Sequence, residues 1–239
     1  SQRVELNNLR RDLNTPQALV LKRKLVAAGL TLVRDEPGII GFRELEKYRF
    51  ATLALGDTNR TVFQTYCGYY APMKHFNAGK EVDTLVQKLL LDSLKQYNVV
   101  LVSIHGTRSK AIDNFGLSPS QMTLLHRLNG LTTVAVTMFG NPYSMGYFES
   151  FPIVLDAYTE DPMVQETAAM ALFGAADLTG ILPVTASPAA KFGQGVRKIY
   201  PYKRLGYGLP ESVGMRSDTL ALLDGIVQEM IATGAAPGC

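Results

Sequence analysis

The sequence predicts an α/β protein, a three-layer α/β/α sandwich around a mostly parallel sheet of five to six strands. Two apolar runs, 99–104 and 132–138, are short, rich in β-branched residues and free of charge, which is typical of strands buried on both faces. Between them, Ser118 and Pro119 suit the N-cap and first position of a helix, and Gly130 suits its end. Strand, helix and strand then form a right-handed βαβ unit, and such alternation recurs along the chain.

Before this unit, amphipathic segments alternate with short apolar runs. Residues 81–96 have apolar side chains on one helical face, and Glu36-Pro37-Gly38 suits the turn of a hairpin. The expected helices are 4–13, 14–29, one capped by Asp57 or Thr58 and ended by Gly68, and 81–96; the expected strands are 30–33, 39–42 as the hairpin's second arm, 49–55 and 73–76.

After the unit, the alternation continues. Residues 151–158 are expected to form a strand, 161–174 a helix and 180–184 a last short strand. From 187 to 210, glycine, proline, lysine and tyrosine dominate without periodicity, which indicates a linker or an extended arm on another surface. Ser217 is expected to cap a final helix with one apolar side.

Composition excludes several classes of function. The 239 residues are 46% hydrophobic, enough for one sizeable core with an appendage. Net charge is +3 and the basic residues are scattered, so no nucleic-acid partner is expected. No apolar run approaches the ~20 residues of a membrane helix. Cys67 reads as a buried thiol, and neither it, Cys239 nor the histidines have metal-ligand spacing, so no metal and no cofactor are expected.

The common catalytic motifs are missing. There is no Gly-x-Gly-x-x-Gly after a strand and no phosphate-binding loop. There is also no Gly-x-Ser-x-Gly elbow and no serine followed by lysine three residues on, which argues against an independent serine hydrolase. Both chain ends suggest a fragment, because the sequence starts within a helical pattern and stops just after Ala-Pro-Gly.

Polar loops at the carboxyl ends of the predicted strands are the candidate site, because ligands of open α/β sheets bind there. His105 and Arg108 follow one strand and form the best polar pair, although they could equally be a packed histidine and an internal ion pair. Asn141 follows the next strand, in a Gly-Asn-Pro sequence that also suits a simple turn. Asp57, after an earlier strand, completes this set.

Asp156 and Glu160 could be considered as paired carboxylates. One lies inside a predicted strand and the other beyond its end, so the sequence does not fix their separation.

Residues 161–187, DPMVQETAAMALFGAADLTGILPVTAS, resemble the end of the C-terminal domain of glycoside hydrolase family 3, which has an ALFG…GxLPVT pattern after a helix. Residues 30–42 resemble that domain's entry strand, with Asp35 in place of its asparagine, and 137–143 resemble its strand followed by GNPY. The resemblance covers roughly residues 10–205. It implies that the catalytic aspartate lies on a (β/α)₈ barrel, which needs about 250 residues and has no room here.

The loop after residues 99–104 separates two branches of that family. In the β-glucosidase branch it supplies a catalytic glutamate, whereas here it reads His105-Gly106-Thr107-Arg108. This departure favours the β-N-acetylglucosaminidase branch, in which the acid is a His–Asp pair on the barrel. No catalytic residue is therefore expected in this chain.

Residues 209–239 resemble the first helix of a β-lactamase-type serine hydrolase domain, whose Ser-x-x-Lys motif would follow. The expected organisation is connector helices from a missing barrel (1–29), an α/β sandwich domain (30–186), a linker or arm (187–210) and the start of a following domain (211–239).

The resemblance implies an accessory domain of a β-N-acetylglucosaminidase-like enzyme, inactive alone, which packs on the barrel and lines the rim of its active site. Its partners would be the barrel, the downstream domain and, through the barrel, a glycan. By family habit the parent would be periplasmic or associated with the cell envelope. The alternative is a free-standing flavodoxin-like module that binds a small ligand or a partner domain.

Overall fold

The computed structural model describes residues 7–201 and 207–235, which belong to two compact units that are described separately. Residues 23–205 form the larger unit, and 1–22 with 206–239 form the smaller one. Within the smaller unit the structure places helices α1 (Leu9–Leu13), η4 (Pro210–Val213) and α7 (Ser217–Ala232). The long helix α2 (Pro16–Gly29) crosses the boundary, and the predicted start at Val4 lies outside the described residues.

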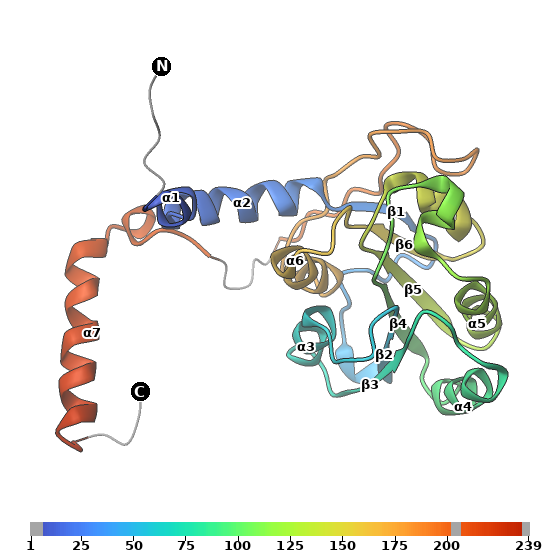
Figure 1. Cartoon of the computed structure of the whole chain (residues 1–239), viewed down its shortest axis with the longest axis horizontal. Coiled ribbons are helices and arrows are strands. Elements are labelled where there is room, and N and C mark those ends of the chain that lie inside the picture. Colours follow the sequence, from blue (N-terminus) through green and yellow to red (C-terminus); the bar gives the residue numbers. More distant parts are fainter. Residues whose placement is uncertain (1–6, 202–206, 236–239) are drawn as a thin grey trace. The chain divides into compact units, whose positions relative to one another are not determined.

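The larger unit is built on one six-stranded sheet with the order β1-β6-β5-β4-β2-β3 (Figure 1). All neighbouring strands are parallel except β1 and β6, which run antiparallel and contain a bulge between Leu32 and Arg34. The strands are β1 (Thr31–Asp35), β2 (Phe50–Leu55), β3 (Met73–Ala78), β4 (Val99–Ile104), β5 (Thr133–Met138) and β6 (Ile153–Asp156). The predicted fold class is confirmed.

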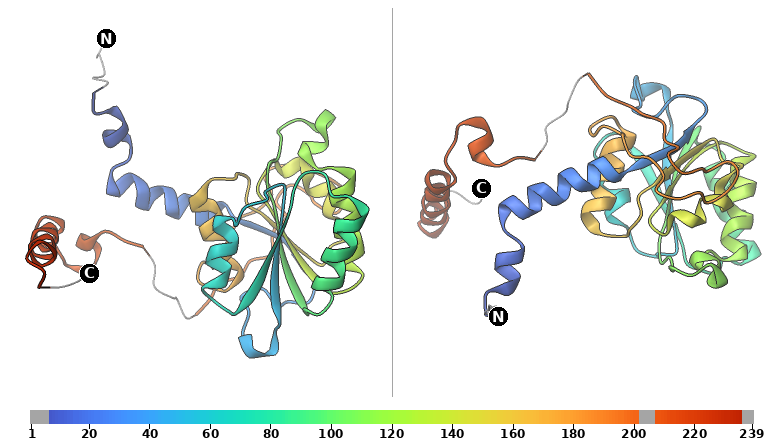
Figure 2. Two further views of the ribbon diagram at one scale, coloured as in Figure 1. Left: turned by 60° about the horizontal axis from the view of Figure 1, so that its bottom comes forward. Right: turned by 90° about the horizontal axis from the view of Figure 1, so that it is seen from above.

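Helices cover both faces of this sheet (Figure 2). Helices α3 (Val62–Gly68) and α6 (Pro162–Leu172) pack on one face, and α4 (Thr84–Leu94) and α5 (Pro119–Asn129) on the other. Short helical segments η1 (Leu45–Lys47), η2 (Ala111–Gly116) and η3 (Pro142–Phe148) lie in the connections.

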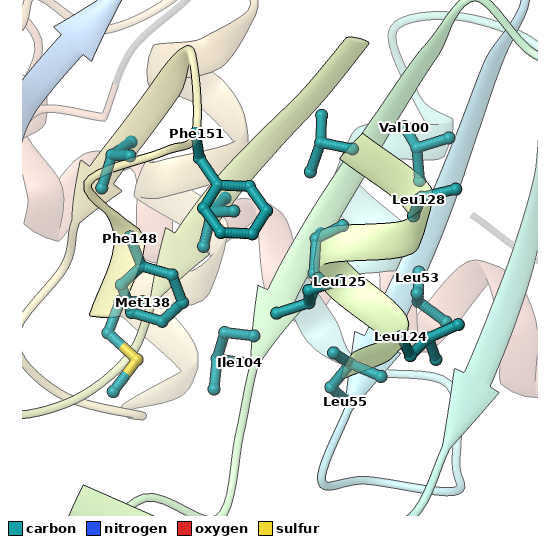
Figure 3. Close-up of a cluster of buried hydrophobic side chains, with 14 of the residues drawn as sticks. Leu53, Leu55, Val100, Ile104, Leu124, Leu125, Leu128, Met138, Phe148 and Phe151 are labelled. Atoms are coloured by element: carbon teal, nitrogen blue, oxygen red, sulfur yellow. The ribbon is translucent and has the colours of Figure 1, made fainter. Parts of the chain in front are cut away.

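The two cores follow from the alternation of side chains along each strand. In β4, Val100 and Val102 face α4 and α5, whereas Val99 and Leu101 face α3 and α6. Figure 3 shows part of the first core, in which Leu124, Leu125 and Leu128 of α5 lie over the sheet. Strands β2 and β4 are buried along their whole length, as expected for a parallel sheet between two helix layers.

Helix starts are set by local side-chain caps. Ser118 accepts from the Gln121 amide while the Gln121 side chain returns to Ser118, so the predicted cap is a complete capping box. Helix α3 begins later than expected, because Thr61 forms the same box with Gln64. Asp57 does not cap that helix; its carboxylate accepts from the Asn59 amide in a turn.

Three sequence expectations are wrong in detail. Residues 39–42 are not a strand, since Asp35 takes the amides of Ile39 and Ile40 and thereby closes a turn. Residues 180–184 are not a strand either, although Gly180 and Leu182 donate backbone hydrogen bonds to neighbouring segments. Ser217 is the first helical residue of α7, whose cap position is Arg216.

The outer edge of β1 is covered by the segment that follows α6. Gly180 donates to the Leu30 carbonyl and Val196 donates to the Leu32 carbonyl at 2.6 Å. Lys198 forms an ion pair of 2.8 Å with Asp35, whose side chain is fully buried. Residues 187–201, predicted to be a linker or arm, therefore run along the domain's own sheet and satisfy the backbone of an edge strand.

We expect Gly180→Ala to loosen this cover. A side-chain carbon at residue 180 would lie 2.5 Å from the carbonyl oxygens of Gly29 and Leu30, so backbone must move, at a cost of about 1–3 kcal/mol of unfolding free energy. Gly29→Ala is the matched control, because it meets nothing within 4 Å. Denaturant unfolding of both variants measures the difference; equal stabilities would contradict the close packing of this segment.

Candidate functional site

The predicted site residues follow strands of one parallel set, so their loops gather at the carboxyl edge of the sheet. A cleft of about 490 Å³ opens there between the loops after β4, β5 and β6. Arg108, Asn141 and Glu160 line it, together with Thr107 and Tyr158. Asp57 follows β2, on the other side of β4, and is outside this lining.

His105 is buried, is not among the residues that line the cleft, and has hydrogen-bond partners for both ring nitrogens. Its Nδ1 is 3.1 Å from the Glu160 carboxylate and its Nε2 is 2.9 Å from the Ser103 hydroxyl. Because a carboxylate can only accept, Nδ1 carries the proton and Nε2 accepts from Ser103. The ring also stacks on Phe139, with 5.2 Å between centroids. Of the two interpretations that the sequence left open, these contacts agree with a histidine packed in the loop.

Ser103, His105 and Glu160 have the connectivity of a hydrolase triad, but not its access. Ser103 lies inside β4 with no exposed surface, and β4 is flanked by β2 and β5. A nucleophile must reach a substrate carbonyl and face an oxyanion hole, which a hydroxyl in the middle of a sheet cannot do. The three residues instead fasten one loop to the next.

Glu160 is the centre of that fastening. Besides His105, it accepts from the Gly106 amide at 2.9 Å, so it joins the loop after β4 to the loop after β6. The hydrogen bond from His105 lowers the pKa of Glu160, partial burial opposes this, and the Gly106 amide adds to the lowering. A carboxylate held ionised in this way cannot serve as a general acid near neutral pH.

Arg108 is the predicted residue that presents its charge to solvent. Its side chain is 63% exposed and lies 3.6 Å from Asp113, a weak surface pair. Its loop is held in shape by the Arg108 amide, which donates to the Phe115 carbonyl. Asn114 and Phe115 both have positive φ angles, and Tyr147 donates to the Asn114 side chain. Strained, anchored loops of this kind are common at functional sites.

Asn141 ties two loops together. Its Oδ1 accepts from the Tyr143 amide, which is the turn chemistry expected of Gly-Asn-Pro, and its Nδ2 donates to the Ser109 carbonyl. Thr107 donates to the Phe139 carbonyl in the same region. Asn141 thus shapes the cleft while still lying on its wall.

The crevice that a flavodoxin-like module would use is closed. The strand order reverses between β2 and β4, so a ligand would enter beside Gly56 and His105. There the backbone is in direct contact, because a side-chain carbon at Gly56 would collide with the His105 carbonyl. The His105 amide also donates to the Leu55 carbonyl. This contact argues against a small ligand in that crevice and does not bear on partner binding elsewhere.

Asp156 and Glu160 do not act as one pair, since they have different partners. Asp156 is fully buried; its Oδ1 accepts from the Tyr158 amide and its Oδ2 has no partner among the described residues. Burial raises the pKa of Asp156 to about 7, and the Tyr158 hydrogen bond only partly offsets this. Tyr158, whose φ is +64°, shares a 2.6 Å hydrogen bond with Thr31.

Sequence reasoning missed Ser103 and Tyr158. Serine inside an apolar strand was the available signal for the first, and nothing in the sequence marked the second.

In the described part of the chain, no three His, Cys, Asp or Glu residues are grouped as metal ligands. Cys67 is a free buried thiol, and burial raises its pKa. Among the described residues, no helix is both long and apolar enough to cross a membrane.

Comparison with known proteins shows which fold this is. A scan against models of protein families finds no match, and a search of curated proteins finds none either. Among solved structures, a fungal multi-domain family 3 β-N-acetylglucosaminidase is similar over 78% of this chain, with a TM-score of 0.60 and 17% identity. The family 3 β-N-acetylglucosaminidase from Paenibacillus sp. FPU-7 is similar over 78%, with a TM-score of 0.59 and 17% identity.

A β-glucosidase from Erythrobacter marinus is similar over 79% of this chain, with a TM-score of 0.60 and 13% identity. The matched parts are 21%, 35% and 36% of these three proteins, so this chain corresponds to a minor part of each. At such identities the likeness establishes a fold shared with part of family 3 glycosidases.

Asp156 predicts an unusual pH dependence of stability. Since its folded pKa of about 7 lies above the ordinary 3.8, the neutral form is favoured by folding, and that stability is lost as pH rises from about 4 to about 7. Asp156→Asn stays neutral and should be more stable than the parent by about 2–4 kcal/mol at pH 8, with little difference at pH 4. Thermal unfolding across this range, with exposed Asp92→Asn as control, measures it. A pH-independent difference would show that Asp156 is not buried as an acid.

Proposed function

We propose that this chain is the accessory C-terminal domain of a family 3 β-N-acetylglucosaminidase-like enzyme, which packs on a catalytic barrel and closes one side of its active-site mouth. The observation that carries the proposal is the shared fold, matched to a minor part of larger glycosidases. The domain has no chemistry of its own in this proposal, and the glycan is bound chiefly by the barrel.

The state of the carboxylates supports an accessory role. A retaining glycosidase needs one carboxylate as nucleophile and a second as acid, both facing the same sugar, roughly 5 Å apart. At the carboxyl edge of this sheet, Asp57 is engaged in a turn, Asp156 is buried, and Glu160 is fixed by His105 and Gly106. The loop after β4, which carries an acid in the β-glucosidase branch, presents Arg108 instead.

The exposed rim supports contact with another domain or its ligand. Around the cleft, Arg108 extends from one loop, Tyr143 and Tyr147 are partly exposed on η3, and Ile112 is 90% exposed on η2. An exposed isoleucine, exposed tyrosines and a guanidinium that faces solvent are suited to packing and to hydrogen bonding at the margin of a sugar site.

The rest of the expected organisation belongs to the same proposal. Helix α7 exposes Leu222, Leu223 and Ile226, as the first helix of a further domain would before packing. The resemblance of its sequence to a β-lactamase-type domain supports that identity, and the periplasmic or envelope location follows from the same family habit.

The first test is hydrolysis of an aryl β-N-acetylglucosaminide by the folded chain, with the aryl β-glucoside alongside. We expect no turnover by this chain and clear turnover by the parent enzyme that carries the barrel. Activity of the chain alone that survives repurification would mean that nucleophile and acid both lie within it, and the accessory role would be wrong.

The rim role predicts different effects for two residues in the complete enzyme. Arg108→Ala removes an exposed charge and should raise KM by about tenfold or less while folding is unchanged. His105→Ala leaves Glu160 and Ser103 without their partner and should lower thermal stability. Arg127→Ala, an exposed arginine on α5, is the control. An unchanged KM in Arg108→Ala would limit the loop to a structural role.

A further inference from the structure

The two edge strands of the sheet, β1 and β3, differ in whether another segment covers their outer side. The outer side of β1 is covered by the segment around Gly180 and Val196, whose amides reach its carbonyl groups. At the opposite edge lies β3, and in the described part of the chain no strand pairs with its outer side. Its residues Met73 to Asn77 are exposed or only partly buried, so this edge is accessible. An open edge is a template for a further strand.

The backbone of β3 offers regularly spaced partners for such a strand. The Gly56 amide donates to the Ala78 carbonyl, which fixes Ala78 as a residue whose backbone faces β2. Because successive residues face opposite sides in a strand, Met73, His75 and Asn77 turn their amides and carbonyls outward. A segment laid beside them would hydrogen-bond through every second residue.

An apolar pocket of about 750 Å³ opens where β3 begins. Leu45, Tyr48, Phe50, Tyr70 and Met73 line it, so it touches the first residue of the open edge. Its walls are held by packing: Tyr70 stacks on Phe173 at 4.8 Å, and Tyr48 contacts Phe50 at 5.2 Å between centroids. A preformed aromatic pocket of this size suits one bulky apolar side chain, with space left over.

The charges along this edge are mostly positive. Arg49 and Lys74 are exposed on the pocket margin, and in the described residues no ion pair joins either of them to a carboxylate. Arg60 lies beside the same strand, where its guanidinium is 3.0 Å from His75. Glu46 is the acidic residue of the pocket lining. The edge therefore favours an acidic occupant and disfavours a second copy of itself, which would bring like charges together.

We propose that the β3 edge binds an extended acidic segment of a partner protein by strand addition, with one aromatic or large aliphatic side chain in the pocket beside Tyr48 and Tyr70. Main-chain hydrogen bonds to Met73, His75 and Asn77 give affinity, and the pocket together with Arg49 and Lys74 gives specificity. The pocket lies where β3 begins, at the opposite end of the strands from the loops after β4, β5 and β6, and the proposal does not depend on the proposed function.

The test uses the whole chain and a fluorescein-labelled peptide of alternating valine and threonine, with a central phenylalanine and glutamates at both ends. Two N-methylated versions carry the methyl groups on alternate residues, in one or the other register. Methylation in one register removes the amides that face β3, whereas methylation in the other leaves them free. Fluorescence anisotropy then measures binding of matched peptides that differ only in register.

We expect the glutamate peptide to bind, one methylated version to lose binding, and the other to retain it. Lysines in place of the glutamates should weaken binding by about tenfold, and so should alanine in place of phenylalanine. Equal binding by both methylated versions would overturn strand addition, and no binding by the glutamate peptide would overturn the proposal.

Variants of the chain test whether peptide binding depends on the charges beside β3 or on positive charge anywhere on the surface. Arg49→Glu combined with Lys74→Glu should weaken binding of the glutamate peptide and strengthen binding of the lysine peptide. The thermal midpoint should not change, because both positions are exposed. Lys88→Glu on α4 combined with Lys95→Glu just after it is the matched control and should change the binding of neither peptide. Sedimentation of the chain alone tests the rival occupant: a dimer that the edge variant disrupts would assign this surface to a second copy and overturn the proposal.

Discussion

Burial of the parallel sheet on both faces is the constraint from which most of this structure follows. Strands β2 and β4 have no exposed residue, so they need an apolar layer on each side and a hydrogen-bonded neighbour at each edge. The alternation of side chains along β4 assigns α4 and α5 to one face and α3 and α6 to the other. The same requirement explains why residues after α6 fold back on β1, where an exposed ladder of carbonyls would otherwise remain.

That constraint also determines what polar groups can do at the carboxyl edge. Loops that leave a buried sheet need their own hydrogen bonds, and here His105, Glu160 and Asn141 supply them. A side chain that joins two loops already uses most of its hydrogen-bonding groups for that contact. Few of these groups are then left to bind a substrate. Arg108 differs because the loop is held through its backbone while its guanidinium stays in solvent. At this end of the sheet, the polar side chains named here therefore mainly hold loops together, and Arg108 extends its guanidinium toward solvent.

Features encoded over a few residues could be predicted, and features that depend on distant residues could not. The strand 99–104, the cap at Ser118 and the parallel βαβ unit each depend on local pattern, and the structure confirms them. Residues 39–42 are as apolar as a strand, but the Asp35 carboxylate competes for their amides. The contact between His105 and Glu160 joins residues 55 positions apart, and only the order of β4, β5 and β6 brings them together.

The distribution of polar and apolar groups bears on the accessory role proposed above. An enzyme concentrates unsatisfied, accessible polar groups in a concave site. Here His105, Asp57 and Glu160 are engaged and Asp156 is buried, whereas large apolar side chains are exposed: Ile112 at the rim, and Leu85 and Leu89 on α4. Exposed apolar groups beside satisfied polar ones are typical of surfaces that other proteins cover. This distribution fits the accessory role proposed above, in which the domain acts through the surfaces that it offers to other proteins.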